Sequence, residues 1–382
     1  MQKSKIAEDL VKLRQALHKN PEVSGEERGT AEKICSFLKQ FEPDNIVSGI
    51  GGNGIIAEFK GEQSGPTVAF RCELDALPIS EKNNISYQST NAGKAHVCGH
   101  DGHMVMIAGL AYSLQKKRPA KGRVLLLFQP AEEDGSGAAS MISDDAFKKF
   151  EPDFIFALHN LPGIPLHKVI LSKSQFASAS RGMLIRLKGK SSHAAEPENG
   201  INPANGMAKI LLMVQDILQE KKLFNDLVLV TPVHARLGEL AYGTSPGDGI
   251  IHFTLRSYRD DDMKVLMEKL ENEVKIISEK EKLSFEIAYE EVFPATVNNQ
   301  TCSELIKQAC VNNSLDFSYI EKPFKWSEDF GHFTAKYRGA IFGLGSGISQ
   351  PALHNPDFDF PDALIPTGID LYNSIYNFIL EK

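Results

Sequence analysis

Apolar residues follow two different spacings along this chain, and each spacing predicts a different domain. Continuous apolar runs are typical of strands that are buried on both faces of a sheet, with helical patterns between them. Three such runs end in acidic or metal-ligand residues; they lie at 68–74, 124–130 and 154–158, with an apolar helical pattern at 104–114. We therefore predict an α/β domain with a mostly parallel central sheet flanked by helices, in which ligands bind beyond the carboxyl ends of the strands.

From about residue 179 the pattern changes to that of a separate unit. Strand and helix patterns follow one another in the order β-α-β-β-α-β, at residues 181–189, 202–222, 227–237, 249–258, 261–280 and 283–292. This order is that of the ferredoxin-like fold, and Asp260 is the predicted N-cap of the second helix. The α/β pattern then resumes. We therefore predict a discontinuous α/β domain, residues 1–178 and 293–382, that is interrupted by an inserted domain at residues 179–292.

The length of 382 residues also favours two domains, and the composition is that of a globular protein. A formal net charge of −7 without a stripe of lysine and arginine argues against binding to nucleic acid. The first helical pattern places Ile6, Leu10, Leu13 and Leu17 on one face, unlike a secretory signal, and no apolar run approaches membrane-spanning length. Five cysteines at irregular spacing fit a reducing compartment. We expect a cytoplasmic protein.

The segment HVCGHDGH, residues 96–103, is dense in metal-ligand side chains. Cys98 and His100 form a Cys-x-His pair, whose thiolate and imidazole both suit zinc or a similar transition ion. Further ligand-type residues follow the predicted strands or lie in a proline-rich loop near the C-terminus: Glu133, His159 and His354. A single histidine at a strand end is usually structural, but these five residues together exceed what one tetrahedral ion takes. We therefore predict two ions that share a bridging water.

Two adjacent glutamates and an aspartate complete the predicted site. Because neighbouring side chains of an extended chain point apart, we assign Glu133 to the metal and Glu132 to the water. Glu132 would take a proton from the metal-activated water and return it to the departing amide nitrogen. Asp75 would hold a liganding imidazole in the required tautomer, with a solvent-exposed turn carboxylate as the alternative. Zinc and manganese are the expected metals, and cobalt and nickel are the alternatives.

Ordered motifs along nearly the whole chain resemble the dinuclear metallohydrolases that include aminoacylases and carboxypeptidases. The closest resemblance is to their N-acyl-amino-acid amidohydrolase branch, which contains hippurate and auxin-conjugate hydrolases. The motifs are LHKNPE, RCELDALPISE, HVCGHDGH, FQPAEE, GKSSHAAEP, SEDFG and LHNPDFDF. The resemblance implies that the five ligands and the general base are those named above, and that the inserted domain is a lid that commonly mediates homodimerisation. His193, in GKSSHAAEP, would then reach an active site, its own or that of the partner subunit, and donate to the oxyanion.

Two positions depart from the pattern of this branch. Glu73 stands where an aspartate is usual, and Gly243 stands where an asparagine often contacts the substrate. The leading hypothesis is a metal-dependent amidohydrolase that cleaves an N-acyl amino acid to a carboxylic acid and a free amino acid. N-acetyl-diaminopimelate deacetylation and dipeptide cleavage are alternatives at the same site. A non-catalytic metal-binding interaction protein is the alternative of a different class, although a structural metal site needs no additional carboxylate such as that of Glu132.

Overall fold

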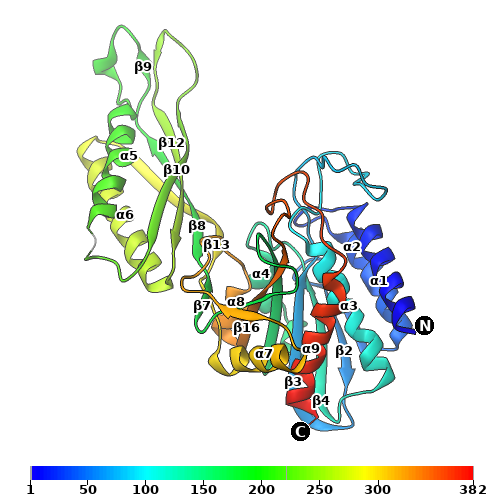
Figure 1. The fold of residues 1–382 in the computed structure, drawn as a ribbon. Helices are drawn as coiled ribbons and strands as arrows, with labels where there is room; N and C mark the ends of the chain where they lie inside the picture. Colours follow the sequence, from blue (N-terminus) through cyan, green and yellow to red (C-terminus); the bar gives the residue numbers. More distant parts are fainter. Residues whose placement is uncertain (1, 221, 382) are drawn as a thin grey trace. The chain divides into compact units, whose positions relative to one another are not determined.

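The computed structural model describes residues 2–220 and 222–381, and its internal contacts divide the chain into two compact units (Figure 1). The first unit contains the chain up to Phe176, the segment Thr296–Lys322 and the chain from Asp329 on. The second unit contains Ala177–Ala295 and Pro323–Glu328. The second unit is therefore built from one long insertion and one short later segment.

An eight-stranded sheet forms the centre of the first unit, in the order β1-β2-β4-β3-β5-β16-β6-β15. β4, β3, β5 and β16 are parallel neighbours, whereas β1, β2 and β6 join the sheet in antiparallel pairs. The strands span Asn45–Ile50 (β1), Gly54–Lys60 (β2), Gln63–Glu73 (β3), Lys121–Gln129 (β4), Phe154–Pro162 (β5), Val169–Leu171 (β6), Phe317–Tyr319 (β15) and Arg338–Gly347 (β16). The predicted α/β fold class is confirmed: the four central strands are parallel, and so are β6 and β15 at one edge of the sheet.

The helices of the first unit pack against this sheet in two groups (Figure 1). In one group α3 contacts α1 and α9, and α9 also contacts α1 and α7; in the other group α4 contacts α8. The helices span Gln2–His18 (α1), Arg28–Leu38 (α2), His100–Lys116 (α3), Gly137–Ser143 (α4), Gln300–Asn312 (α7), Gly331–Lys336 (α8) and Leu364–Leu380 (α9). The shorter elements are the 3-10 turns Lys39–Phe41 (η1) and Phe147–Lys149 (η2), and the strand pair Gln175–Ala177 (β7) with Thr296–Val297 (β14). The last residue of β7, Ala177, is the first residue of the second unit.

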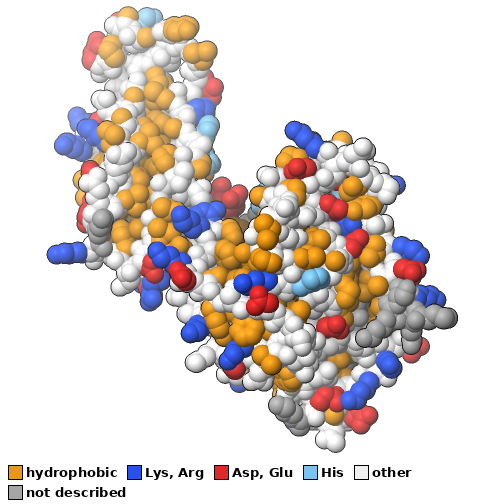
Figure 2. Space-filling view, in the orientation of Figure 1, with side chains coloured by type: hydrophobic (Ala, Val, Ile, Leu, Met, Phe, Trp, Pro, Cys, Tyr) orange, Lys and Arg blue, Asp and Glu red, His pale blue; other side chains and the backbone are white. Residues whose placement is uncertain are grey.

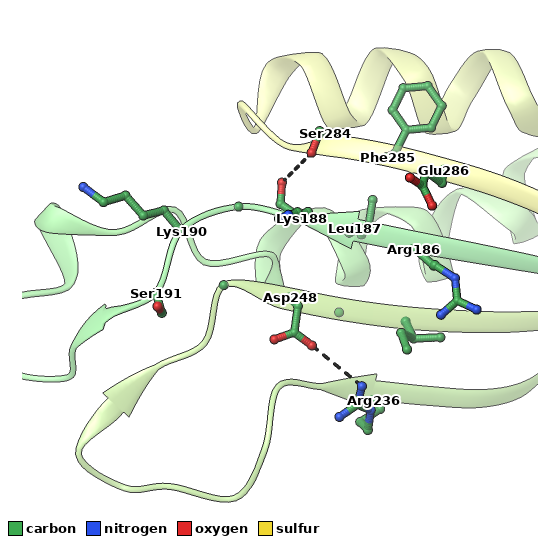
Figure 3. Close-up of a pocket in the computed structure, with 14 residues that line it drawn as sticks. Arg186, Leu187, Lys188, Lys190, Ser191, Arg236, Asp248, Ser284, Phe285 and Glu286 are labelled. Atoms are coloured by element: carbon green, nitrogen blue, oxygen red, sulfur yellow. Dashed lines mark hydrogen bonds and ion pairs between the residues drawn. The ribbon is translucent and has the colours of Figure 1, made fainter.

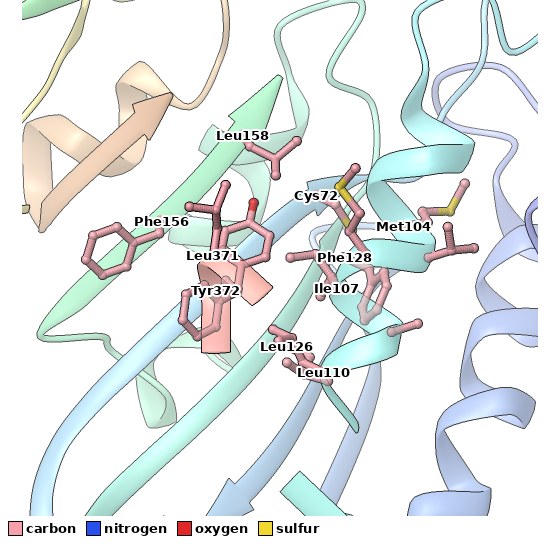
Figure 4. Close-up of a cluster of buried hydrophobic side chains, with 14 of the residues drawn as sticks. Cys72, Met104, Ile107, Leu110, Leu126, Phe128, Phe156, Leu158, Leu371 and Tyr372 are labelled. Atoms are coloured by element: carbon pink, nitrogen blue, oxygen red, sulfur yellow. The ribbon is translucent and has the colours of Figure 1, made fainter. Parts of the chain in front are cut away.

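The central strands are buried on both faces, which explains why their apolar runs are continuous. Phe70 and Cys72 of β3 belong to a cluster with side chains of α3 and α9 (Figure 4), and the Phe70 ring lies 4.8 Å from that of Tyr372. Ala69 and Arg71, whose side chains point to the other face of β3, are equally inaccessible to solvent. Each large apolar side chain that is fully buried contributes roughly 1.5–3 kcal/mol relative to an exposed one. The sheet is therefore a tightly packed frame for the loops that leave its carboxyl ends.

The second unit has a four-stranded antiparallel sheet in the order β10-β12-β8-β13, and two helices. Its elements follow the chain order β8-α5-β10-β12-α6-β13, and span Ala179–Lys188, Ala204–Gln219, Val228–Leu237, Asp248–Ser257, Asp260–Lys280 and Ser284–Phe293. Met183, Ile185 and Phe253 pack with the apolar sides of the helices in a core of their own. A short pair, Ser192–His193 (β9) with Thr244–Ser245 (β11), and the 3-10 turn Pro197–Asn199 (η3) lie outside this sheet.

The predicted N-cap of the second helix of this unit is wrong. α6 begins at Asp260 itself, so Arg259 occupies the cap position, and its side chain makes no capping hydrogen bond. The Asp260 carboxylate instead accepts a hydrogen bond from the Ala295 N–H at 3.0 Å. This aspartate therefore ties the start of α6 to the chain that leaves β13.

Apolar side chains remain exposed on the second unit. Figure 2 shows hydrophobic side chains gathered along the visible face of this unit. Leu212 of α5 and Val233 of the edge strand β10 are 66% and 59% exposed, respectively. Among the described residues, no helix combines the length and the apolarity that crossing a membrane requires.

Candidate metal centre

Gly99 determines how the first two predicted ligands enter helix α3. Its φ of 94° lies in the left-handed region, and a Cβ at this position would stand 2.3 Å from the side-chain oxygen of Asn160. Only glycine therefore lets this loop press against the end of β5. His100 is the first residue of α3, and Cys98 Sγ lies 3.5 Å from His159 Nε2 on β5.

The structure brings the predicted ligands and the predicted base together beyond the carboxyl ends of the central strands. His100 Nε2 lies 3.8 Å from Glu133 Oε1 and 4.0 Å from Glu132 Oε2. Glu133 Oε2 lies 3.6 Å from His354 Nε2. Ligand atoms of Cys98, Glu133 and His354 all lie within 4.8 Å of one another. The residues therefore form one contiguous cluster of sulfur, nitrogen and oxygen donors.

This donor set fits divalent cations. Atoms that bind one zinc ion at about 2.0–2.3 Å stand roughly 3–4 Å apart. The separations of 3.5, 3.8 and 3.6 Å between neighbouring donors of this cluster lie in that range. His100 Nδ1 donates to the Asp75 carbonyl oxygen at 2.9 Å, which leaves the lone pair on Nε2. Within the described part of the chain, this buried Nε2 atom forms no hydrogen bond. Burial, with the Glu133 charge, raises the pKa of the Cys98 thiol well above its usual value, so a thiolate at this place needs a cation beside it.

Glu132 and Glu133 lie in a turn after β4, so the prediction that an extended backbone separates their side chains is wrong. The Gly135 N–H donates to the Glu132 carbonyl oxygen at 2.8 Å within this turn. Both carboxylates reach the same imidazole, that of His100. What distinguishes them is their second oxygen: that of Glu133 faces His354, whereas Glu132 Oε1 accepts the Asp329 N–H at 3.4 Å.

Asp75 is fully buried, which excludes the alternative of an exposed turn carboxylate. Its Oδ2 atom accepts hydrogen bonds from the Ser24 hydroxyl at 2.7 Å and from the Glu133 N–H at 3.0 Å. Its Oδ1 atom lies 3.5 Å from His100 Nδ1, so the carbonyl oxygen of Asp75 is the nearer partner of that imidazole. Burial acts to raise the pKa of Asp75, but the neighbouring His100 imidazole and the hydrogen bonds from the Glu133 N–H and the Ser24 hydroxyl hold it below its usual value.

A buried chain of hydrogen bonds beside the cluster was not predicted from the sequence. Glu73 pairs with Arg71 and accepts from His103 Nδ1 at 2.7 Å, while His103 Nε2 accepts the Asn160 N–H at 3.2 Å. Both nitrogens of His103 are thus engaged, so the nearby group of Glu73, His100 and His103 is a hydrogen-bonded support and not a further metal site. The only signal in the sequence was that HVCGHDGH contains more ligand-type residues than the site needs.

His193 belongs to the second unit, where it is an exposed residue of β9. Its Nδ1 atom accepts the Ala195 N–H at 3.1 Å, so in the neutral ring the proton resides on Nε2. The Gly243 carbonyl oxygen accepts from the Ala194 N–H at 3.0 Å, and a Cβ at Gly243 would meet no atom within 4 Å. An Nε2–H donor is the form that the predicted role of His193 requires.

The second unit also contains a hollow of about 740 Å³ (Figure 3). Arg186, Lys188 and Lys190 contribute positive charge to it, and Glu286 and Asp248 contribute negative charge. None of the residues predicted for the site lines this hollow. It therefore adds nothing to the metal centre.

Comparison with known proteins decides the family. The sequence model described as "Peptidase family M20/M25/M40" matches residues 69–377. This chain belongs to that family. It is therefore a metal-dependent hydrolase of amide bonds, and the resemblance inferred from the motifs is confirmed.

Curated relatives with named activities share more than a quarter of their residues with this chain. N-acetyldiaminopimelate deacetylase of Bacillus subtilis is 28% identical over 372 residues, which cover 97% of this chain and 99% of the relative. Hippurate hydrolase of Campylobacter jejuni is 28% identical over 365 residues, with 94% of each chain covered.

Solved structures show the same fold. A putative aminohydrolase from methicillin-resistant Staphylococcus aureus superposes with a TM-score of 0.90 at 22% identity, covering 99% of this chain and 97% of its own. A Bacillus subtilis protein described as a dinuclear metal binding peptidase from the M20 family superposes with a TM-score of 0.84 at 24% identity, covering 99% of both chains.

Proposed function

We propose that this M20 hydrolase cleaves N-acyl amino acids to a carboxylic acid and a free amino acid, with two divalent cations as cofactors. The observation that carries the proposal is the convergence of Glu132 with the five candidate ligands in one cluster, in which Glu132 and Glu133 both approach the imidazole of His100. A relative named hippurate hydrolase and another named N-acetyl-L-cysteine deacetylase support this class of substrate.

The cations would be held by the donors that the sequence predicted: Cys98, His100, Glu133, His159 and His354. When bound, such ions polarise a carbonyl group and lower the pKa of a water molecule between them. The solved structure described as dinuclear and metal-binding supports a pair of ions. The Cys98 thiolate favours zinc, whereas imidazole and carboxylate donors also accept manganese, cobalt or nickel.

Glu132 is the proposed general base. Its side chain is largely buried, one oxygen is anchored by the Asp329 N–H, and the other points toward His100 Nε2 at 4.0 Å. A carboxylate in this position can take a proton from the attacking water and return it to the departing nitrogen. Asp75 would assist by orienting His100 and by fixing the Glu133 N–H.

We assign the second unit, predicted at residues 179–292, to a lid that also forms a homodimer. The exposed Leu212 and Val233, on a helix and an edge strand, support an interface with a second copy, since apolar edge surfaces of this kind are usually covered. His193 would donate its Nε2–H to the oxyanion of an active site in its own or the partner subunit. Five unpaired thiols support a reducing, cytoplasmic location.

Two alternatives use the same metal centre. N-acetyl-diaminopimelate deacetylation is supported by the names of several relatives, and dipeptide cleavage is compatible with the same chemistry. A non-catalytic metal-binding protein is disfavoured because the Glu132 carboxylate is held beside a donor set that is complete without it.

The test is a hydrolysis panel of N-acyl amino acids, N-acetyl-diaminopimelate and dipeptides, combined with metal analysis. The enzyme is assayed after chelation and after addition of zinc or manganese. We expect chelation to abolish activity, metal addition to restore it, and N-acyl amino acids to be the best substrates. Preference for N-acetyl-diaminopimelate or for dipeptides selects one of the alternatives, and a fully metal-loaded protein that cleaves no amide refutes the proposal.

A further inference from the structure

The turn that carries Glu132 contains a backbone conformation that alanine rarely adopts. Ala131 has φ of 48°, in the left-handed region that a Cβ disfavours, and the residue is almost fully buried. Its carbonyl oxygen accepts the Gly137 N–H at 2.9 Å. Such a conformation persists only where the surroundings hold it in place.

The group that holds Ala131 is a carboxylate from a remote part of the chain. Glu27, just before helix α2, is inaccessible to solvent, and its Oε1 atom accepts the Ala131 N–H at 2.8 Å. The same oxygen accepts the Gly25 N–H at 2.8 Å, and Oε2 accepts Asn53 Nδ2 at 2.8 Å. Although Glu27 occupies the N-cap position of α2, its side chain makes no capping hydrogen bond. The carboxylate therefore serves the turn after β4 and not its own helix.

A second carboxylate holds the other side of the same turn. Asp75 Oδ2 accepts the Glu133 N–H at 3.0 Å and the Ser24 hydroxyl at 2.7 Å. The residues before and after Glu132 are thus each anchored by a buried carboxylate. Ser24 and Gly25, just before Glu27 in the sequence, each donate a hydrogen bond to one of these carboxylates: Ser24 to Asp75 and Gly25 to Glu27.

We propose that Glu27 is a positioning residue for the reaction: by holding Ala131 in its left-handed conformation, it sets the direction in which the Glu132 carboxylate points. The inference rests on the proposed role of Glu132 as general base. With Ala131 held this way, adjacent glutamates both reach His100, which an extended chain would not allow. Loss of the Glu27 anchor leaves the Asp75 anchor of Glu133 in place, so catalysis should suffer more than metal binding.

The test compares Glu27→Met with Glu27→Gln. Methionine keeps a similar volume but removes both acceptor oxygens, whereas glutamine keeps one oxygen for the Ala131 N–H, and Asn53 can turn its amide to accept from the new amino group. Metal content, kcat and KM are measured with an N-acyl amino acid that the wild type hydrolyses. For Glu27→Met we expect full metal content, KM within about twofold of wild type, and kcat lower by about 10- to 100-fold, since a displacement of about 1 Å costs this much. For Glu27→Gln we expect kcat within about threefold of wild type.

Two matched variants separate positioning from general stability. Glu26→Met changes an exposed neighbour that pairs with Lys94 and should leave kcat unchanged. Ala131→Gly makes the left-handed conformation accessible without a Cβ penalty, so in this background Glu27→Met should cost no more than about threefold in kcat. With selective ¹⁵N-alanine labelling, the Ala131 amide proton should shift upfield in Glu27→Met and stay unchanged in Glu26→Met.

Wild-type kcat in metal-loaded Glu27→Met overturns the inference, as does an equal loss with and without Ala131→Gly. If Glu27→Met fails to fold, Glu27→Asp replaces it, because aspartate keeps the charge but is one methylene shorter. At least a tenfold lower kcat is then expected, and wild-type kcat overturns the inference. If the wild type cleaves no amide, the proposed function fails and this role in catalysis fails with it, while the Ala131 amide shift still reports whether Glu27 holds the turn.

Discussion

The Nδ1 atom of His18 lies 2.9 Å from the carboxylate of Asp101, so a buried histidine of α1 is paired with the residue that follows the candidate ligand His100. Its Nε2 atom lies 3.1 Å from Glu81, and Arg14 approaches the same Asp101 oxygen at 3.2 Å. Burial acts to lower the pKa of His18, but its hydrogen bonds with Asp101 and Glu81 raise it to about 9. The folded protein therefore favours the charged imidazole.

Because His18 is charged when paired with Asp101, we expect the protein to lose stability in mildly alkaline solution. Because the pKa of His18 is higher in the folded state than its ordinary value of 6.5, its contribution is complete below pH 6.5 and disappears as the pH rises through about 9. At about 1.4 kcal/mol per pKa unit, the contribution amounts to roughly 3 kcal/mol. Urea unfolding of the wild type and of His18→Gln should show a free-energy difference that shrinks across this pH range. A difference that stays constant would mean that His18 is not charged in the folded protein.

Gly99 and Gly93 provide a matched pair of substitutions. Both glycines have a positive φ, but a Cβ at Gly99 would stand 2.3 Å from the Asn160 oxygen, whereas a Cβ at Gly93 would meet no atom within 4 Å. Gly93→Ala should cost only the backbone strain of about 1–2 kcal/mol. Gly99→Ala should cost clearly more and should also weaken metal binding, because Cys98 and His100 flank it. Unfolding by urea and metal competition with a chelator measure both effects, and equal effects of the two substitutions would contradict the close contact.

Metal removal should lower the free energy of unfolding, and the dependence of this free energy on metal concentration should give the number of bound ions. A ligand that binds only the folded state adds about 1.4 kcal/mol for each tenfold increase in its free concentration above the dissociation constant. Two ions per chain predict a slope of about 2.8 kcal/mol per tenfold change in free zinc, and one ion predicts half of that. Unfolding experiments in zinc buffers measure the slope. The absence of any slope would exclude a metal site of useful affinity in this cluster.

The parts of the fold that could be predicted from the sequence are those in which local pattern and burial agree. The continuous run ending at Leu74 predicts a strand because both faces of β3 are covered. The short strands Val169–Leu171 and Phe317–Tyr319 carry too few residues to show a period. The assignment of Pro323–Glu328 to the second unit depends on contacts with a distant part of the chain, such as that between Ser178 and Phe324, which no local pattern encodes.

Some features of the candidate site could likewise be predicted from the sequence, and others could not. The clustering of ligand-type residues was predictable from residue type and from their place near the ends of strands, although His159 lies within β5 and not after it. The role of Glu27 could not be predicted, because it depends on a hydrogen bond from Ala131, which is more than a hundred residues away in the sequence. The turn that brings Glu132 and Glu133 to one imidazole could have been found, since Gly135 and the residues around it are typical turn formers.

The most direct test of the proposed chemistry compares metal content and turnover in Glu132→Gln. We predict that this variant binds two divalent ions per chain, as the wild type does, and that its kcat on an N-acyl amino acid falls by at least about 100-fold, because no carboxylate is left to move the proton. The matched variant Glu133→Gln should instead lose metal together with activity. A fully metal-loaded Glu132→Gln enzyme with wild-type turnover would contradict the assignment of Glu132 as the base.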